Sequence, residues 1–294
     1  MTAIVLSDRA KGILFFLAAW TVIPIMDACA KALGNMDYPS LMITWGRFAF
    51  SIILLLPLLM GRRRNAFSLP PDKGTQTLRA LCLVLATTGF YMGLRTLPLA
   101  DALAIYLIYP FIVTALSALV LGEMPGGRRW VAIAVGFMGS LLIIRPGFDG
   151  VPLGTVFILG AAIAFAGYNL LTRRIAGRSD PWQTLVFQAG IGLAVTSMAL
   201  PFAWRTPELD GLTLFVGMGV AATVGHYLLI RAYDYAPAPV LAPFGYFEII
   251  SAAALGYFVF GDFPDALTWA GVAVIVLSGV YIGFRERRLA DGAL

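Results

Sequence analysis

Long uninterrupted apolar runs dominate this sequence, and short polar or turn-forming segments separate them. A helix needs about 20 residues to cross a bilayer core of roughly 30 Å, and ten runs near that length are present. Runs such as SIILLLPLLM do not alternate between apolar and polar residues, which favours helices over the strands of a membrane barrel. The pattern predicts an all-α integral membrane protein with ten transmembrane helices. Their predicted ranges are 12–32, 40–60, 77–96, 100–121, 128–145, 153–173, 183–203, 212–232, 238–260 and 266–284.

The composition strengthens this interpretation. Of 294 residues, 60% are apolar and 13% are charged, about half the charged share of an ordinary soluble domain. The ten spans leave too few residues between them for a soluble domain. Cys29 is predicted near the outer end of the first span and Cys82 near the inner end of the third. Because the two thiols are then far apart, neither a disulfide nor a metal site formed by both is expected. The Walker motif of nucleotide-driven pumps and the HExxH motif of metalloproteases are absent from the sequence. We therefore expect that the protein has no cofactor and is not an enzyme.

Lys and Arg residues gather on one predicted side of the membrane. With a cytoplasmic N-terminus, 16 of the 21 basic residues fall on the inner side, four fall on the outer side, and Arg47 lies within a span. Cytoplasmic loops carry such an excess of basic residues. Both termini are therefore predicted to face the cytoplasm, and the protein is expected in the inner (plasma) membrane. Because these loops account for the net charge of +5, no nucleic-acid partner is expected.

The two halves of the chain resemble each other. The segment GFYMGLRTLPLADA (89–102) matches GHYLLIRAYDYAPA (225–238), and ALSALVLGEMPGGRRWVAIAVG matches ALGYFVFGDFPDALTWAGVAVI after a three-residue insertion. The predicted repeats, 1–146 and 147–294, each contain five spans. Because five is an odd number, the second repeat starts on the opposite side of the membrane and is inverted. Many secondary transporters use inverted repeats for alternating access.

These motifs resemble a known family. LRTLPLADA, a span closing in LGE, and GFMGSLLIIRPG, repeated as YDYAPA, FGD and GVAVIVLSGVYIG, are similar to the ten-helix EamA branch of the drug/metabolite transporter superfamily, and most to its YddG-type amino acid exporters. The resemblance implies a basket of helices around a central cavity that is lined mostly by spans 1, 3, 4, 6, 8 and 9. Where many members have Glu-Pro early in the ninth span, this chain has Glu248-Ile249, with the expected helix break earlier, at Pro243.

Charged side chains inside a span are costly and usually face a cavity or a partner. Trp20, Pro24, Asp27 and Lys31 lie on one stripe of the first predicted helix. One interpretation is that Asp27 neutralises Lys31, which lies one turn later. The other is that Asp27 meets the amine of a substrate or carries a coupling proton. Asn169, the matching residue of the second half, slightly favours this second interpretation.

Two further titratable residues lie within predicted spans. Glu248 follows the expected break at Pro243, where exposed backbone groups can bind a polar ligand. Alternatively, Glu248 forms a structural ion pair with Arg47. His226 is either a packing histidine or a group that binds a ligand or a proton.

Aromatic residues with polar tips complete the candidate site. Tyr and Trp offer a flat apolar face together with a hydrogen-bonding group, which suits a substrate with an aromatic or aliphatic body and a charged end. The predicted substrate-binding residues are Trp20, Asp27, Tyr91, Tyr106, Tyr109, Tyr168, Asn169, His226, Tyr227, Tyr246 and Glu248.

The sequence thus favours a secondary transporter that exports small metabolites, first of all aromatic and other neutral amino acids. An uptake carrier for riboflavin, S-adenosylmethionine or drug-like amphipathic compounds is an alternative, as are an intramembrane enzyme and a lipid flippase. The expected partners are a small-molecule substrate and membrane lipid. Small residues at Gly136 and Ser140 in the fifth span, and at Gly279 and Gly283 in the tenth, allow close helix packing. They pack the two halves together or, alternatively, form a homodimer interface.

Overall fold

The structure is a computed structural model of the chain. It describes residues 8–60, 67–121, 127–144, 151–175, 177–236, 241, 244–245 and 247–291, and among these every regular element is a helix. The α-helices are α1 (Asp8–Asn35), α2 (Ser40–Leu59), α3 (Lys73–Gly93), α4 (Leu99–Tyr106), α5 (Tyr109–Leu121), α6 (Gly127–Ile144), α7 (Leu153–Ile175), α8 (Pro181–Ala199), α9 (Leu209–Tyr235), α11 (Phe247–Leu255) and α12 (Ala266–Asp291). The short elements η2 (Leu200–Phe202) and η4 (Gly256–Phe260) follow α8 and α11.

Local sequence signals explain where α8 begins. Asp180 precedes α8, and its carboxylate accepts hydrogen bonds from the backbone N–H groups of Trp182, at 2.8 Å, and Gln183, at 3.3 Å. Pro181 occupies the first helical position, where no N–H is needed.

Pro24 lies inside α1 without ending it. Since proline has no N–H, the carbonyl of Trp20 lacks its usual helical donor.

The prediction of one continuous helix over 100–121 is wrong. The chain turns at Leu107 and Ile108, so that α4 and α5 share this span. Pro110, the second residue of α5, cannot donate to the carbonyl of Tyr106, which favours the break at this point. Counting α4 and α5 together gives the ten predicted spans. The break expected at Pro243 lies outside the described residues, and α11 begins at Phe247.

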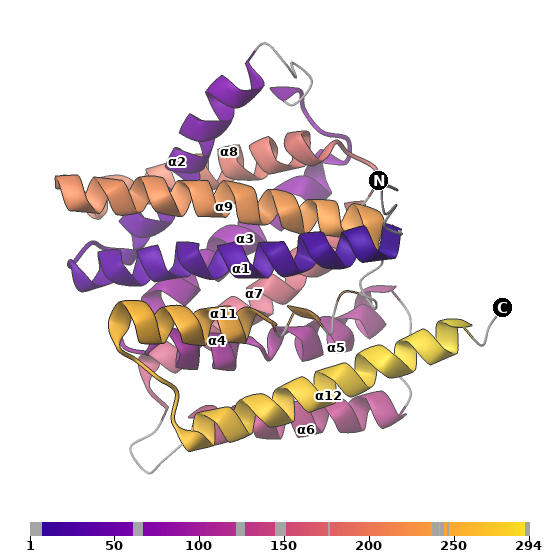
Figure 1. The fold of residues 1–294 in the computed structure, drawn as a ribbon. Helices are drawn as coiled ribbons and strands as arrows, with labels where there is room; N and C mark the ends of the chain where they lie inside the picture. The colour runs from indigo at the N-terminus through magenta and orange to yellow at the C-terminus, as the bar shows by residue number, and fades with distance from the viewer. Residues whose placement is uncertain are drawn as a thin grey trace, which may run out of the picture.

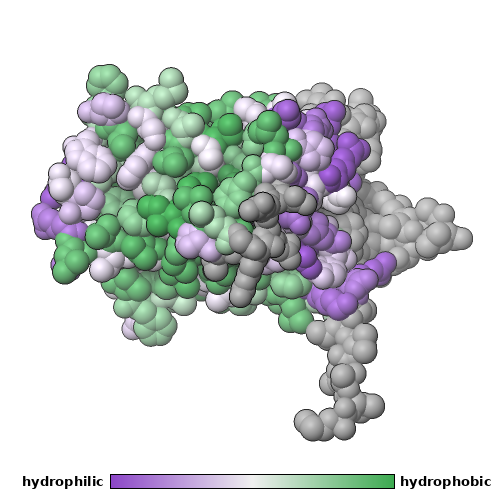
Figure 2. All heavy atoms as spheres, turned by 90° about the horizontal axis from the view of Figure 1, so that it is seen from above, coloured by the Kyte–Doolittle hydropathy of each residue, from purple (hydrophilic) through white to green (hydrophobic). Residues whose placement is uncertain are grey.

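Five of the described helices have the length and composition of membrane spans. α1, α2, α7, α8 and α9 are long and apolar enough to cross a bilayer. Apolar side chains form a broad band across the middle of the molecule, with polar residues toward its two ends (Figure 2). Large apolar side chains such as Met198 and Phe258 are exposed on the surface, where lipid can cover them.

The most extensive helix contacts join the two halves of the chain. α1 packs along α9, α3 packs along α7, and α6 packs along α12 (Figure 1). In the predicted repeat, α1 corresponds to α7, α3 to α9 and α6 to α12. When each helix is replaced by its counterpart, the α1–α9 pair becomes the α7–α3 pair, and the α6–α12 pair remains the same. The packing therefore has the pattern expected of two equivalent halves.

Glycines bring α6 and α12 close together. A Cβ atom added at Gly139 would lie 3.0 Å from the carbonyl oxygen of Gly271. Of the predicted small residues, Gly136 faces the ring of Phe111 instead. The close approach fits the predicted packing of one half on the other, and the homodimer stays a prediction.

Both chain ends lie at the same end of the bundle (Figure 1), here called the terminal end. Its cytoplasmic location also stays a prediction.

Candidate functional site

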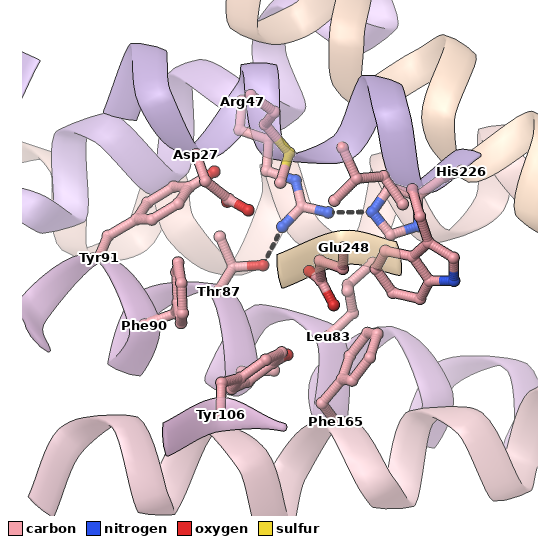
Figure 3. Close-up of a pocket in the computed structure, with 14 residues that line it drawn as sticks. Asp27, Arg47, Leu83, Thr87, Phe90, Tyr91, Tyr106, Phe165, His226 and Glu248 are labelled. Carbon is pink, nitrogen blue, oxygen red and sulfur yellow. Dashed lines mark hydrogen bonds between the residues drawn. The ribbon is translucent and has the colours of Figure 1, made fainter. Parts of the chain in front are cut away.

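A cavity lies in the interior of the bundle, between helices of both halves. Six of the eleven predicted site residues line it: Trp20, Asp27, Tyr91, Tyr106, His226 and Glu248. The remaining lining residues are Ile23, Met26, Arg47, Leu83, Ala86, Thr87, Phe90 and Phe165. Figure 3 shows polar groups from α1, α2, α9 and α11 on one side of this cavity and the rings of Tyr106 and Phe165 on the other.

Two carboxylates face the cavity without a partner. Asp27 of α1 is 4% exposed and Glu248 of α11 is 2% exposed. Among the described residues, neither side chain forms an ion pair or a hydrogen bond, and Glu248 Oε2 is fully buried. Lys31 does not pair with Asp27. Its ammonium group donates to the carbonyl of Leu97 at 3.0 Å and lies 3.4 Å from Asp262.

Arg47 of α2 is the cation of the cavity. Its guanidinium group donates to Thr87 of α3 and to Nε2 of His226 on α9 (Figure 3). The expected ion pair with Glu248 is not formed in the described part of the chain. Because a guanidinium group only donates hydrogen bonds, Nε2 of His226 accepts here and the imidazole is neutral. The guanidinium group is thus held by neutral groups, while the two carboxyl groups remain open to the cavity.

Other polar atoms of the cavity wall are also unsatisfied. The indole N–H of Trp20 and the hydroxyl of Tyr91 are buried and have no hydrogen-bond partner in the described structure. Buried polar groups are almost always paired with protein or water. Three unpaired polar atoms around one cavity, counting Glu248 Oε2, therefore indicate a site that a polar ligand or water completes.

The opposite wall is aromatic. The ring centroids of Tyr106 and Phe165 are 5.3 Å apart, and Phe90 lies 5.0 Å from Tyr106. Tyr109 packs edge-on against Phe165 behind this wall and is not among the lining residues. The break between α4 and α5 places both tyrosines beside α7.

Four of the predicted residues lie elsewhere or are not described. Tyr168 does not line the cavity, and its hydroxyl accepts a hydrogen bond from Arg79. Both polar atoms of the Asn169 amide have partners. The nitrogen donates to the Phe165 carbonyl at 2.8 Å, and the oxygen accepts from the Tyr233 hydroxyl at 3.4 Å. Tyr227 stacks on Trp182, with centroids 4.1 Å apart, in a separate apolar cluster. Tyr246 lies outside the described residues.

The sequence interpretation did not include several lining residues in the site. The position of Arg47 inside a span makes it a functional candidate, but the predicted substrate-binding set omits it and pairs it with Glu248 instead. Thr87 lies one turn before Tyr91, so helical periodicity places both on one face of α3. Phe165 has no polar group, so no sequence signal separates it from the other apolar residues of α7.

Comparisons with known proteins agree on one family. The model of the EamA-like transporter family matches residues 10–145 and again 152–284. An S-adenosylmethionine uptake transporter of Rickettsia prowazekii is 27% identical, with 96% of each chain covered. A riboflavin transporter of Vibrio cholerae is 29% identical over 95% of this chain and 97% of its own. A pseudopaline exporter of Pseudomonas aeruginosa is 27% identical over 93% of this chain and 96% of its own.

The fold is also similar to a solved one. A crystal structure with 16% sequence identity superimposes with a TM-score of 0.64, covering 96% of this chain and 98% of that chain. At this identity the similarity concerns the fold alone. The relatives above are named as transporters and not as enzymes, and their similarity extends over nearly the whole chain. This chain belongs to the EamA-like transporter family and is a multi-pass membrane protein that transports small molecules.

Proposed function

We propose that this protein is a secondary carrier for zwitterionic metabolites that combine an α-amino acid group with an aromatic body. This class includes the aromatic amino acids predicted from the sequence, and it also includes S-adenosylmethionine, the substrate named for the relative in Rickettsia prowazekii. Export and uptake both occur among the named relatives. The direction of net transport therefore follows from the gradients in the cell rather than from the residues.

The observation that carries this proposal is the separation of charges in the cavity. Asp27 and Glu248 have no cation within ion-pair distance in the described structure, and Arg47 is bound only to Thr87 and His226. An unpaired buried charge costs several kcal/mol. A substrate that brings a cationic group to the carboxylates and a carboxylate to Arg47 would offset both costs. Tyr106 and Phe165 then provide a surface on which a flat body can stack.

The internal pseudosymmetry supports transport by alternating access. We propose that residues 1–146 and 147–294 are inverted five-span repeats, with the cavity between them. Two matches to one family model and the exchange of helix contacts between halves both support this arrangement. Rocking of one repeat against the other would open the cavity first to one side of the membrane and then to the other.

Riboflavin is the second candidate substrate. It is favoured by the aromatic wall, by the unpaired Trp20 N–H and Tyr91 hydroxyl, and by the relative named as a riboflavin transporter. A neutral isoalloxazine ring does not need a charged partner. The two candidates therefore differ in their dependence on Asp27 and Glu248.

Counterflow in proteoliposomes tests the proposal. Purified protein is reconstituted and loaded in turn with tyrosine, phenylalanine, S-adenosylmethionine or riboflavin, and uptake of the same labelled compound is measured with and without a pH gradient. At substrate concentrations below KM, we expect at least one zwitterion to exchange at least about 100-fold faster than in liposomes containing the Asp27→Asn, Glu248→Gln double variant. Exchange of riboflavin alone would replace the first candidate with the second. Exchange of none of the four would overturn the proposal.

A further inference from the structure

A second arginine is buried inside the bundle. Arg79 of α3 has no exposed surface. Its Nε donates to the Thr172 hydroxyl at 2.7 Å, its Nη2 donates to the Tyr168 hydroxyl at 2.9 Å, and its Nη1 has no partner. No described carboxylate lies within 4.0 Å of it. The guanidinium carbon also lies 4.6 Å from the centroid of the Tyr168 ring, but neutral hydroxyl groups and a ring face compensate a buried charge less well than a carboxylate does. Within the part of the chain that the structure describes, this positive charge therefore has no counter-ion.

The position of Arg79 relates it to the central cavity. It lies one helical turn before Leu83, which lines that cavity, and on the same face of α3. On α7, Tyr168 and Thr172 continue the face of the lining residue Phe165 in the same way. Both helices continue toward the terminal end, because α3 begins there and α7 ends there after an even number of spans. The cavity-facing surfaces therefore extend past Arg79 in that direction.

A separate small pocket lies beyond Arg79. It is lined by Thr172, Thr184, Ser179, Tyr233 and Asp234, among others. Thr172 belongs both to this pocket and to the hydrogen bonds of Arg79. On α9, His226 lines the central cavity while Tyr233, two turns later, lines the second pocket. Two helices, α7 and α9, thus line both pockets, and the Arg79 guanidinium group of α3 is bound to α7 between the lining residues Phe165 and Ile175.

Hydrogen bonds also connect the two arginines. His226 accepts from Arg47 through Nε2, and its Nδ1 lies 3.4 Å from the Tyr168 hydroxyl. The same hydroxyl accepts from Arg79. Arg47 and Arg79 are therefore linked through two neutral side chains. An anion released by the first guanidinium group would find the second one step nearer the terminal end.

We propose that the substrate route to the terminal end runs between α3, α7 and α9, and that Arg79 is an anion-binding station on this route. The ligand is the carboxylate of the transported zwitterion, so this inference rests on the function proposed above. The planar guanidinium group suits a carboxylate because it can present two parallel N–H donors. Nη1 is already free, and the hydroxyl partners of Nε and Nη2 are weaker acceptors than a carboxylate.

Transport measured separately from each face tests this assignment. Arg79→Gln and Arg79→Lys are compared with Arg174→Gln, which removes an exposed arginine from the last turn of α7. Right-side-out and inside-out vesicles give the KM for substrate offered at either face. We expect Arg79→Gln to raise the KM at the terminal face about tenfold and to change the KM at the other face less than about twofold. Arg79→Lys keeps the charge, so it should raise the KM less, and again mainly at the terminal face.

A second readout identifies the group that is bound. The transported compound and its analogue without the carboxylate, such as tyrosine and tyramine, are used as inhibitors at the terminal face. Arg79→Gln should weaken inhibition by the zwitterion only. Equal changes in KM at both faces, or equal weakening of both inhibitors, would assign Arg79 a merely structural role and overturn the inference. If Arg79→Gln does not accumulate in the membrane, the same two comparisons are made with Arg79→Lys.

The wild-type measurement separates this inference from the proposed function. If no zwitterion is transported, the proposed function itself fails, and the inference fails with it. If a zwitterion is transported but the effects of Arg79→Gln lack sidedness, only the inference fails.

Discussion

Asp27 and Lys31 lie one turn apart on α1, yet their surroundings differ in kind. Asp27 faces the central cavity and has no ion-pair or hydrogen-bond partner in the described structure. Lys31 reaches the carbonyl of Leu97, the carboxylate of Asp262 and the ring of Phe260. Its contacts tie α1 to turns in both halves of the chain, at the end of the bundle opposite to the termini.

This difference separates two reasons for placing a charge at membrane depth. A charge with a full set of protein partners stabilises one arrangement of helices. A charge without partners costs free energy in the empty protein, and that cost is offset when a ligand arrives. By this criterion the proposed role of Asp27, Glu248 and Arg79 is to bind ligand, whereas the contacts of Lys31 stabilise the arrangement of the helices.

The largest expected effect follows from removing the unpaired carboxylates. Asp27→Asn or Glu248→Gln keeps the shape of the side chain and removes the charge that would attract a cationic group. We expect kcat/KM for zwitterion transport to fall by about 100-fold, because a charged hydrogen bond inside a site is worth roughly 3 kcal/mol. Thermal unfolding of the purified variants should occur at the same temperature or higher, since an uncompensated charge has been removed.

Asp210→Asn is the matched control for these two variants. Asp210 lies in the first turn of α9 and is exposed, so its loss should leave transport and stability unchanged. A large drop in unfolding temperature for Asp27→Asn would show that this carboxylate is a structural group. The contrast between Asp27 and Lys31 would then be lost.

The sequence predicted the spans better than it predicted the site. Span lengths follow from the bilayer thickness, and helical periodicity grouped Trp20 with Asp27 on one face of α1. Periodicity identifies the face of a helix but not the neighbour that covers it. Asn169 matches Asp27 in the repeat, yet its amide is occupied by Phe165 and Tyr233.

The break at Leu107 and Ile108 shows a related limit. Both residues are apolar, so the hydrophobic run continues through the break, and only Pro110 indicates it. Arg47 illustrates the same limit for charges. A sequence reveals that a buried cation needs partners, but the choice of Thr87 and His226 over Glu248 depends on how α2, α3, α9 and α11 pack.

A smaller effect is expected at the paired charge. Lys31→Met should lower the maximal transport rate less than about fivefold and leave KM within about twofold, because its contacts position helices and touch no substrate. Lys31→Met, Asp262→Asn and the double variant form a thermodynamic cycle for thermal stability. Since the Asp262 side chain is 40% exposed, a coupling of about 1 kcal/mol or less is expected. A tenfold rise in KM for Lys31→Met would place Lys31 among the ligand-binding charges.

The smallest effect distinguishes two tyrosines by their hydroxyl groups. Both were candidates from the sequence, but Tyr91 lines the cavity with an unpaired hydroxyl, and Tyr227 stacks on Trp182 outside it. Tyr91→Phe should raise KM about twofold to threefold, because a neutral hydrogen bond at the weaker end of the usual range is worth about 0.5 kcal/mol. Tyr227→Phe keeps the stacked ring, so transport and unfolding temperature should both stay at the wild-type value. If Tyr227→Phe impairs transport as much as Tyr91→Phe does, then lining the central cavity is not what distinguishes substrate-binding residues. The comparison therefore tests the location of the site with two substitutions that each remove one oxygen atom.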